Sequence, residues 1–454
     1  MARLRSSRST KRTHVVLIPG FAGFDALGQL EYYGGLTELF GKLRADNEVL
    51  HYFDNFPTAA VATRARLLRE YLLKRVARGE ISNDDDVTLI GHSTGGLDIR
   101  LLLWELCPLH EDVKPIMVDG RAPVVPADLI DRVRRVVFLS VPHWGTNIAD
   151  WVRSHWLLRK AFIENLRATV AGSELSLLER MESAITANTF SITGAPVYEA
   201  VRDALDEANE DNGEDTEYRK AKAHDAASEL ALYLRHMASD FRAIDDLTSS
   251  APGRSNARRG PMSPAHFNPE QRETELNQLR KTKIEFLSYA TIGKRPFQFD
   301  PDSSAPLWEL TNACTYPEVC KDAAMSARTD CMYRMCYRAC AGGPFKPQNE
   351  SRELAKRISP TQPVEVWDND GIVNTFSMFW PLGKNVLVHA DHMDIVGQFH
   401  RVPAESGGGR KSRTYDLLMS DSGFKKETFN DIWKDIFDFA LGRGSAAKIF
   451  GAAA

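Results

Sequence analysis

One serine has neighbours that could make it a nucleophile. Ser93 lies in the segment Gly91-His-Ser-Thr-Gly-Gly96, after an apolar run that ends at Ile90 and before an apolar stretch over 97–106. Small residues around a serine are typical of a very tight strand-to-helix turn, which lifts the hydroxyl clear of the sheet at a helix N-terminus. The alternative is an idle serine in an ordinary glycine-rich turn. The pattern predicts a serine that attacks an acyl group.

A serine hydroxyl needs a base that accepts its proton. The chain has 12 histidines, and His389, His392 and His400 follow the last apolar run. His392 is the candidate base because it lies in a loop just beyond that run, from which it could return to the serine. His389 stands at the end of the run, where a packed histidine is the simpler interpretation.

The acid that orients the base is expected in the segment Val364-Glu-Val-Trp-Asp-Asn-Asp-Gly371. This segment offers Asp368 and Asp370. Asp370 precedes Gly371, which permits a tight turn, whereas Asp368 is placed like a turn-capping residue. We therefore expect Asp370 to hold the imidazole in the required tautomer and to stabilise the imidazolium.

Two backbone N–H groups would have to stabilise the oxyanion that forms during acyl transfer. One is the N–H of Thr94, directly after the serine. The other is the N–H of Phe21, in the loop Pro19-Gly-Phe-Ala-Gly23, where the flanking glycines allow a close approach to substrate. A plain turn at the end of a strand is the alternative for this loop.

These residues must be positioned by the short apolar runs of the chain. Strands are predicted over 14–18, 87–90, 135–139, 284–290, 364–367 and 386–388, and helices over 64–78 and 97–106. Short buried strands that alternate with helices favour an α/β fold, with a mostly parallel central sheet flanked by helices on both faces.

The spacing of these runs also predicts how the chain is divided. Residues 1–12 read as a flexible tail, 13–150 and 281–454 as the two parts of the core, and 151–280 as a mainly helical cap or lid insertion. One face of a cap helix is apolar, from Leu230 to Ile244, and either packs on the core or covers the serine pocket. A cysteine-rich insertion occupies about 306–350. Its cysteines lack the paired spacing of zinc sites, and their redox state stays open.

Composition excludes some classes of function. The 454 residues carry 57 basic and 61 acidic side chains, a net charge of −4, so nothing favours nucleic acid as a partner. No apolar run approaches the roughly 18 residues of a transmembrane span. The basic N-terminus lacks the apolar region of a secretory signal. We therefore expect a cytoplasmic protein, with secretion open if the N-terminus is processed or another export route is used.

The motifs together resemble those of the bacterial true lipases of the Pseudomonas and Burkholderia type, which are triacylglycerol lipases of the α/β-hydrolase superfamily. The matching segments are, in order, Pro19–Asp25, Tyr32–Gly35, Gly91–Gly96, Val141–Asp150, Asn369–Val373 and His392–Gln398. The resemblance implies an α/β-hydrolase fold and favours Asp370 and His392. The chain departs from the family at Pro19, where a histidine is usual, and at Thr94, where a glutamine is usual.

The resemblance also implies a structural calcium ion near the histidine loop, although the chemistry itself needs no cofactor. Asp394 would be one carboxylate ligand, Gln398 and Val402 would offer carbonyls, and Asp300 or Asp302 would supply the second carboxylate. Oxygen ligands of this kind suit calcium. An Asp394 that caps a helix or pairs with an arginine is the alternative.

The sequence thus predicts a serine carboxylic-ester hydrolase for lipids or other apolar esters, including those at a lipid–water interface. Trp144, Trp151 and Trp156 are candidate substrate-binding residues. A short-chain esterase or a polyester depolymerase would share the same catalytic residues. An acyltransferase and a non-catalytic protein that binds apolar ligands are the remaining alternatives.

Overall fold

The computed structural model describes residues 11–23, 26–27, 30–107, 127–155, 157, 159–160, 163–164, 167–168, 216–250, 262–296, 333–399, 416–418 and 420–444. For 26–27, 30, 127–128 and 216–227 only the backbone is described.

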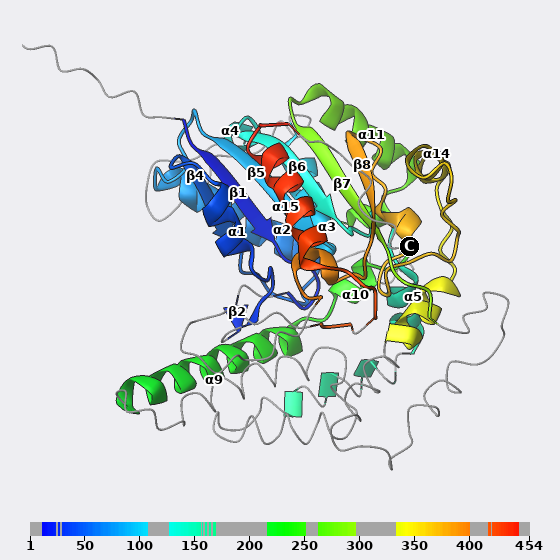
Figure 1. Cartoon of the computed structure of the whole chain (residues 1–454), viewed down its shortest axis with the longest axis horizontal. Helices are drawn as coiled ribbons and strands as arrows, with labels where there is room; N and C mark the ends of the chain where they lie inside the picture. Colours follow the sequence, from blue (N-terminus) through cyan, green and yellow to red (C-terminus); the bar gives the residue numbers. More distant parts are fainter. Residues whose placement is uncertain are drawn as a thin grey trace, which may run out of the picture.

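A parallel sheet of six strands forms the centre of the protein (Figure 1). Its order is β4-β1-β5-β6-β7-β8, and every neighbouring pair is parallel. The strands are β1 (Thr13–Ile18), β4 (Glu48–Tyr52), β5 (Asp86–His92), β6 (Val133–Leu139), β7 (Glu285–Ile292) and β8 (Lys384–His389). Because all six run the same way, the loops that follow them meet at one edge of the sheet. A separate antiparallel pair joins β2 (Ala26–Leu27) to β3 (Leu30–Glu31).

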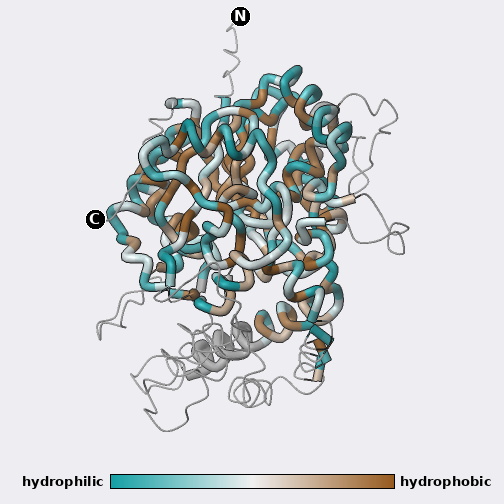
Figure 2. The backbone as a smooth tube through the Cα atoms, turned by 90° about the vertical axis from the view of Figure 1, so that its right-hand side faces the viewer, coloured by the Kyte–Doolittle hydropathy of each residue, from teal (hydrophilic) through white to brown (hydrophobic). Residues whose placement is uncertain are grey.

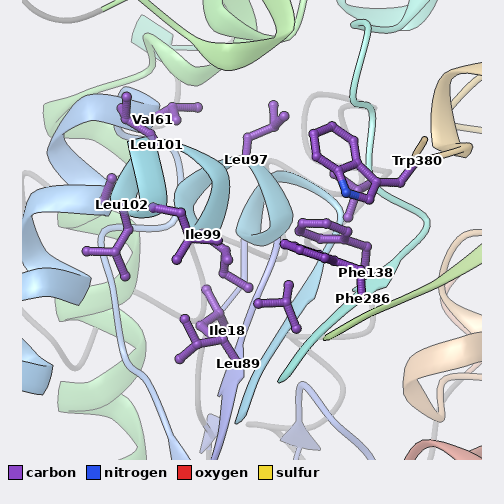
Figure 3. Packing of buried hydrophobic residues seen from close by; sticks show 14 of the residues in the cluster. Ile18, Val61, Leu89, Leu97, Ile99, Leu101, Leu102, Phe138, Phe286 and Trp380 are labelled. Carbon is purple, nitrogen blue, oxygen red and sulfur yellow. The ribbon is translucent and has the colours of Figure 1, made fainter. Parts of the chain in front are cut away.

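Helices cover both faces of the sheet, which explains its continuous apolar strands. The helices α1 (Leu36–Leu43) and α15 (Lys426–Ala440) lie on one face, and α2 (Val61–Ala77) and α3 (Thr94–Leu106) lie on the other (Figure 1). Side chains of β1 alternate between the two cores, Val15 and Leu17 on the α15 side and Val16 and Ile18 on the α3 side. Figure 3 shows how Ile18 packs beneath α3. Hydrophobic segments lie inside and hydrophilic ones mostly outside (Figure 2).

The chain between β6 and β7 contributes further helices. These are α5 (Asn147–Ser154), α9 (Thr216–Ser239), α10 (Ala243–Asp246), the 3-10 helix η3 (Pro264–His266) and α11 (Pro269–Lys281). Helix α9 crosses the end of the sheet at which the strands finish (Figure 1). Helix α11 instead packs on α3, since Glu275 forms a buried ion pair with Arg100 at 2.6 Å. Further elements are α4 (Ala127–Ile130), α14 (Asn349–Ile358), η4 (Thr375–Met378) and η5 (Asp394–Val396).

Five of the six predicted strands are confirmed, and the helices predicted over 64–78 and 97–106 are present with shifted ends. The cap helix predicted from Leu230 to Ile244 is divided, since α9 ends at Ser239 and α10 begins at Ala243. The strand predicted over 364–367 is wrong, because that segment is a turn in which Asp368 N–H donates to Glu365 O at 3.0 Å. Pro363 cannot donate to a sheet ladder, and Val366 is 39% exposed. The edge strand β4 was not predicted because its sequence, Glu-Val-Leu-His-Tyr, has no continuous apolar run.

This strand order, with a serine at the turn between β5 and α3, is that of the α/β-hydrolase fold. The prediction of fold class is confirmed. Among the described residues, no helix is long and apolar enough to cross a membrane.

Candidate active site

Ser93 occupies a strained turn between β5 and α3. Its backbone φ of 53° and ψ of −127° lie in a region that residues other than glycine rarely adopt, as expected of a tight elbow. Its N–H donates to Leu139 O at 2.8 Å, which ties the elbow to the neighbouring strand. A Cβ atom on Gly95 would lie 2.5 Å from Ile18 O, and one on Gly96 would lie 2.1 Å from a methyl group of Val141. The small residues of the motif are therefore required by the packing around the serine.

The predicted acid and base are in direct contact. His392 Nδ1 lies 2.7 Å from Asp370 Oδ2, and both residues are almost fully buried. The same carboxylate oxygen accepts the hydroxyl of Thr291 at 2.6 Å. Its other oxygen accepts the backbone N–H groups of Ile372 at 3.0 Å and Val373 at 2.7 Å. These donors fix the carboxylate while it orients the imidazole ring.

The loop that follows β8, over 390–399, carries His392 and is named here the histidine loop. It contacts the turn at Ser93. His92, the residue before Ser93, contacts His392 O through Nε2 at 2.9 Å, and the two imidazole ring centres are 4.7 Å apart. Among the described residues no hydrogen bond joins Ser93 Oγ to His392 Nε2. In unliganded enzymes such bonds are often long and tighten only with substrate.

The loop after β1 lies directly against the serine. A Cβ atom on Gly20 would approach Ser93 Cβ to 2.7 Å, so only glycine fits there. The carbonyl of Gly20 accepts a hydrogen bond from Arg64 Nη1 at 3.1 Å. Because the N–H of Phe21 belongs to the same peptide unit, it points away from the guanidinium. Within the described part of the chain, neither this N–H nor that of Thr94 has a backbone acceptor.

Arg64 contacts the loop after β1, and the sequence does not reveal this contact. Its buried guanidinium donates to Pro19 O at 2.7 Å and to Pro57 O at 3.0 Å, and pairs with Asp98 at 2.9 Å. Burial raises the pKa of Asp98 to about 6, and the charge of Arg64 opposes that rise. Arg64 lies in the first turn of α2, which is rich in arginine, and nothing in the sequence distinguishes it from the other arginines of that helix. Only the fold brings it to the loop after β1.

The structure describes two of the three predicted substrate-binding tryptophans. Trp144 is 3% exposed, stacks on Trp380 in the core and donates its indole N–H to Ser351 at 3.1 Å. It is therefore a core residue, and we do not include it in the proposed substrate site. Trp151 is half-buried on α5, with its ring against His155. Trp156 lies outside the described residues.

The predicted calcium ligands are described only in part. Asp394 is 1% exposed and accepts the N–H of Asp391 at 2.8 Å, a contact within its own loop. Burial and the charge of Asp391 raise the pKa of Asp394 well above its usual range. Gln398 uses its side-chain amide to donate to Glu31 O at 2.6 Å. Asp300, Asp302 and Val402 lie outside the described residues.

The described residues contain no group of three or more His, Cys, Asp or Glu side chains arranged to hold a metal ion. Asp391 and Asp394 are two neighbouring buried carboxyl groups in the loop that carries His392. Two ionised carboxylates repel each other, so this pair could still accept a cation such as calcium.

Part of the cysteine-rich insertion shields the acid. Residues 333–341 form a helix in which Cys336 and Cys340 are buried free thiols. Tyr333 from this helix leaves no room for a side chain at Gly371, where a Cβ atom would lie 2.7 Å from its ring. The carbonyl of Cys340 accepts the side-chain amide of Asn374 at 2.9 Å. The insertion thus packs on the turn that carries Asp370.

No family model matches the chain, and neither does any curated protein. Among solved structures, EstA from Clostridium botulinum is similar at 16% identity and a TM-score of 0.38, over 91% of this chain and 87% of that one. Lipase 1 from Pelosinus fermentans gives 17% and 0.37, over 85% and 94%. The Bacillus licheniformis lipase BlEst2 gives 12% and 0.35, over 85% and 87%. Similarities this low assign no activity to this chain, and the likeness to the Pseudomonas and Burkholderia lipases stays a prediction from the motifs.

Proposed function

We propose that this protein is a serine carboxylic-ester hydrolase of the lipase type, with Ser93 as nucleophile, His392 as base and Asp370 as the orienting acid. The observation that carries the proposal is the strained Ser93 elbow at the sheet edge where Asp370 binds His392. A strained backbone at a serine, with tightly packed glycines at positions 91, 95 and 96, is characteristic of a nucleophile elbow.

The contacts of Asp370 define the tautomer of the base. An ionised carboxylate only accepts, so His392 Nδ1 carries the proton that lies toward Asp370. His392 Nε2 is then left with a lone pair that can take the proton of Ser93. As the serine oxygen attacks the ester carbonyl, the imidazole becomes a cation, and the buried carboxylate at 2.7 Å stabilises it.

The reaction proceeds in two halves. Ser93 Oγ bonds to the carbonyl carbon, His392 takes the serine proton, and the tetrahedral adduct expels the alcohol as His392 returns that proton to the leaving oxygen. Water then attacks the acyl-enzyme with His392 again as base, and the second adduct releases the carboxylic acid and free Ser93.

The N–H groups of Phe21 and Thr94 would stabilise the oxyanion of both adducts. Thr94 is the first residue of α3, so its N–H is among those without an intrahelical acceptor. Phe21 N–H is aimed by the Arg64 bond on the other side of its peptide unit. Donors fixed before substrate arrives need no reorganisation during the reaction.

The substrate is proposed to be a lipid or another apolar ester. The end of α9 and the residues just after it cover the loop over 19–23, named here the oxyanion loop. Tyr233 of α9 donates its hydroxyl to Ala22 O at 2.7 Å, and Phe241, two residues beyond α9, packs edge-on against Phe21. The buried side chains Leu230, Leu234 and Met237 belong to the hydrophobic core on the α15 side of the sheet, against which Phe21 and Phe241 also pack. A lid that opens at a lipid–water interface would expose this face, with Trp151 and Trp156 beside the acyl chain.

Calcium would act on the position of the loop and not in the chemistry. Asp394 and the carbonyl of Gln398, with Val402 and Asp300 or Asp302, would hold the ion beside the loop that carries His392. Bound there, it would offset the charge of the buried carboxylates.

The test is hydrolysis of p-nitrophenyl esters from C2 to C16 by the wild type and by Ser93→Ala. Turnover that peaks at C8 or longer and is lost in the variant supports the lipase proposal. A peak at C2 to C4 supports a short-chain esterase, and release of a transesterified product with added alcohol supports an acyltransferase. Equal rates for the wild type and the variant at every chain length would contradict the proposal.

A further inference from the structure

Two buried side chains connect the three loops of the proposed site. The N–H of Gly20, in the oxyanion loop, donates to the hydroxyl of Tyr32 at 3.0 Å. That hydroxyl lies 2.6 Å from His92 Nδ1. His92 Nε2 in turn contacts the carbonyl of His392 at 2.9 Å. The connection therefore runs from the oxyanion loop, through the residue before the nucleophile, to the base.

The acceptors along this connection define where its hydrogens lie. A carbonyl only accepts, so His92 Nε2 must carry a hydrogen toward His392 O. In a neutral ring, His92 Nδ1 is then an acceptor, and the hydroxyl of Tyr32 donates to it. The Tyr32 oxygen keeps a lone pair for the N–H of Gly20. Every donor in the connection meets an acceptor only if His92 is neutral with its hydrogen on Nε2.

The surroundings favour that neutral ring. His92 is fully buried and Tyr32 is 3% exposed. Burial lowers the pKa of His92 well below its usual range, and a positive charge on His392 would lower it further, although the hydrogen bond to the His392 carbonyl opposes this. A charged His92 would donate from Nδ1 to the Tyr32 oxygen, and the hydroxyl hydrogen of Tyr32 would then lose its acceptor in the connection.

A second set of contacts ties the same loops together. The side-chain amide of Gln398, in the histidine loop, donates to Glu31 O at 2.6 Å and to Tyr32 O at 3.3 Å. The N–H of Gly34 donates to Val396 O at 2.9 Å. The backbone around Tyr32 is thus attached to the histidine loop, and its hydroxyl reaches the oxyanion loop.

We propose that Tyr32 and a neutral His92 are positioning residues that hold the oxyanion loop, Ser93 and His392 in one fixed arrangement. This inference rests on the proposed ester hydrolysis, since it concerns the same site. Neither residue takes part in bond making. Each acts by keeping the oxyanion donors and the base within the short distances that acyl transfer needs.

The first test removes only the hydroxyl, as Tyr32→Phe. The matched control is Tyr289→Phe, because Tyr289 is equally buried and donates to Asp435 at 2.6 Å on the α15 side of the sheet. We expect Tyr32→Phe to lower kcat by about 10- to 100-fold with little change in KM. We expect Tyr289→Phe to keep the wild-type kcat while losing a comparable amount of Tm. If both variants lose kcat only in proportion to Tm, Tyr32 is merely structural and the inference is overturned.

A second pair of variants tests His92 by rescue. His92→Leu cannot donate to His392 O and should lose at least as much kcat as Tyr32→Phe. His92→Gln retains an N–H at the position of Nε2 and should recover part of that loss. Equal losses in both variants would contradict a role for the donated hydrogen.

A spectroscopic measurement separates this inference from the proposed function. In ¹⁵N-labelled protein, the imidazole signals of His92 should show one neutral form with the hydrogen on Nε2 from pH 8 to pH 5, and Tyr32→Phe should disturb it. A His92 that titrates near its ordinary pKa, or that carries its hydrogen on Nδ1, would overturn the inference. If the wild type hydrolyses no ester, the proposed function fails, and these signals still decide whether the connection exists.

Discussion

Replacing Gly20 by alanine should damage catalysis far more than it damages the fold. The added Cβ atom would lie 2.7 Å from Ser93 Cβ and 2.8 Å from the Tyr32 hydroxyl. An ordinary contact needs at least 3.4 Å, so the oxyanion loop or the serine must move by about 0.7 Å. A displacement approaching 1 Å at reacting groups costs up to about 100-fold in rate. We therefore expect kcat/KM of Gly20→Ala to fall by about 10- to 100-fold.

The assay is hydrolysis of the best p-nitrophenyl ester, together with thermal unfolding. Gly41→Ala is the matched control, because a Cβ atom there meets nothing within 4 Å and the residue lies in helix α1. It should retain full activity and gain about 0.5–1 kcal/mol of stability from the better helix former. A Gly20→Ala variant with activity within threefold of wild type would refute the placement of this loop against the nucleophile.

Three further predictions concern the acid, the response to low pH and calcium. Thr291→Val removes a 2.6 Å hydrogen bond to the Asp370 carboxylate and should lower kcat about tenfold, whereas Thr291→Ser should stay near wild type. His14 and His51 are buried 2.9 Å apart, and burial lowers the pKa of His14 and takes that of His51 to about 3. The unfolded chain binds protons at these histidines below about pH 6.5, whereas the folded chain resists protonation of His51 until about pH 3. Stability should therefore fall as the pH drops from about 6.5 toward 3, by up to about 1.4 kcal/mol per pH unit for His51, and the lowered pKa of His14 acts in the same direction. Urea unfolding at pH 7 and pH 5 checks this, and His51→Leu should reduce the difference. Calcium should raise Tm relative to EDTA, and Asp394→Asn should remove that effect; a Tm indifferent to calcium in the wild type would rule out the predicted ion.

The sequence was informative where a motif and its flanking elements were contiguous. Gly91–Gly96 between an apolar strand and an apolar helix predicted the Ser93 elbow, and the structure has that turn with the expected strain. The preference for Asp370 over Asp368 rests on Gly371 and on the motif resemblance of Asn369–Val373. In the structure Asp370 contacts His392, while Asp368 closes a turn and pairs with Arg295 at 3.0 Å.

Contacts between distant segments could not be predicted in the same way. Thr291 reaches Asp370 from β7, and Arg64 reaches Gly20 from α2, because the sheet order brings those elements together. Sequence also gives no sign that Trp144 packs against Trp380, because an aromatic residue near a motif packs in the core as readily as in a pocket. A helix from the cysteine-rich insertion packs on the turn that carries Asp370. The spacing of the cysteines does not predict this contact.

The most direct test of the central claim is to locate the nucleophile with a phosphonate ester, which forms a stable adduct with an activated serine. Intact-mass analysis of the wild type should show one added phosphonyl group, and peptide mapping should place it on Ser93. Ser93→Ala should gain none, and His392→Ala should react far more slowly. An adduct on another serine, or equal labelling of Ser93→Ala, would contradict the account.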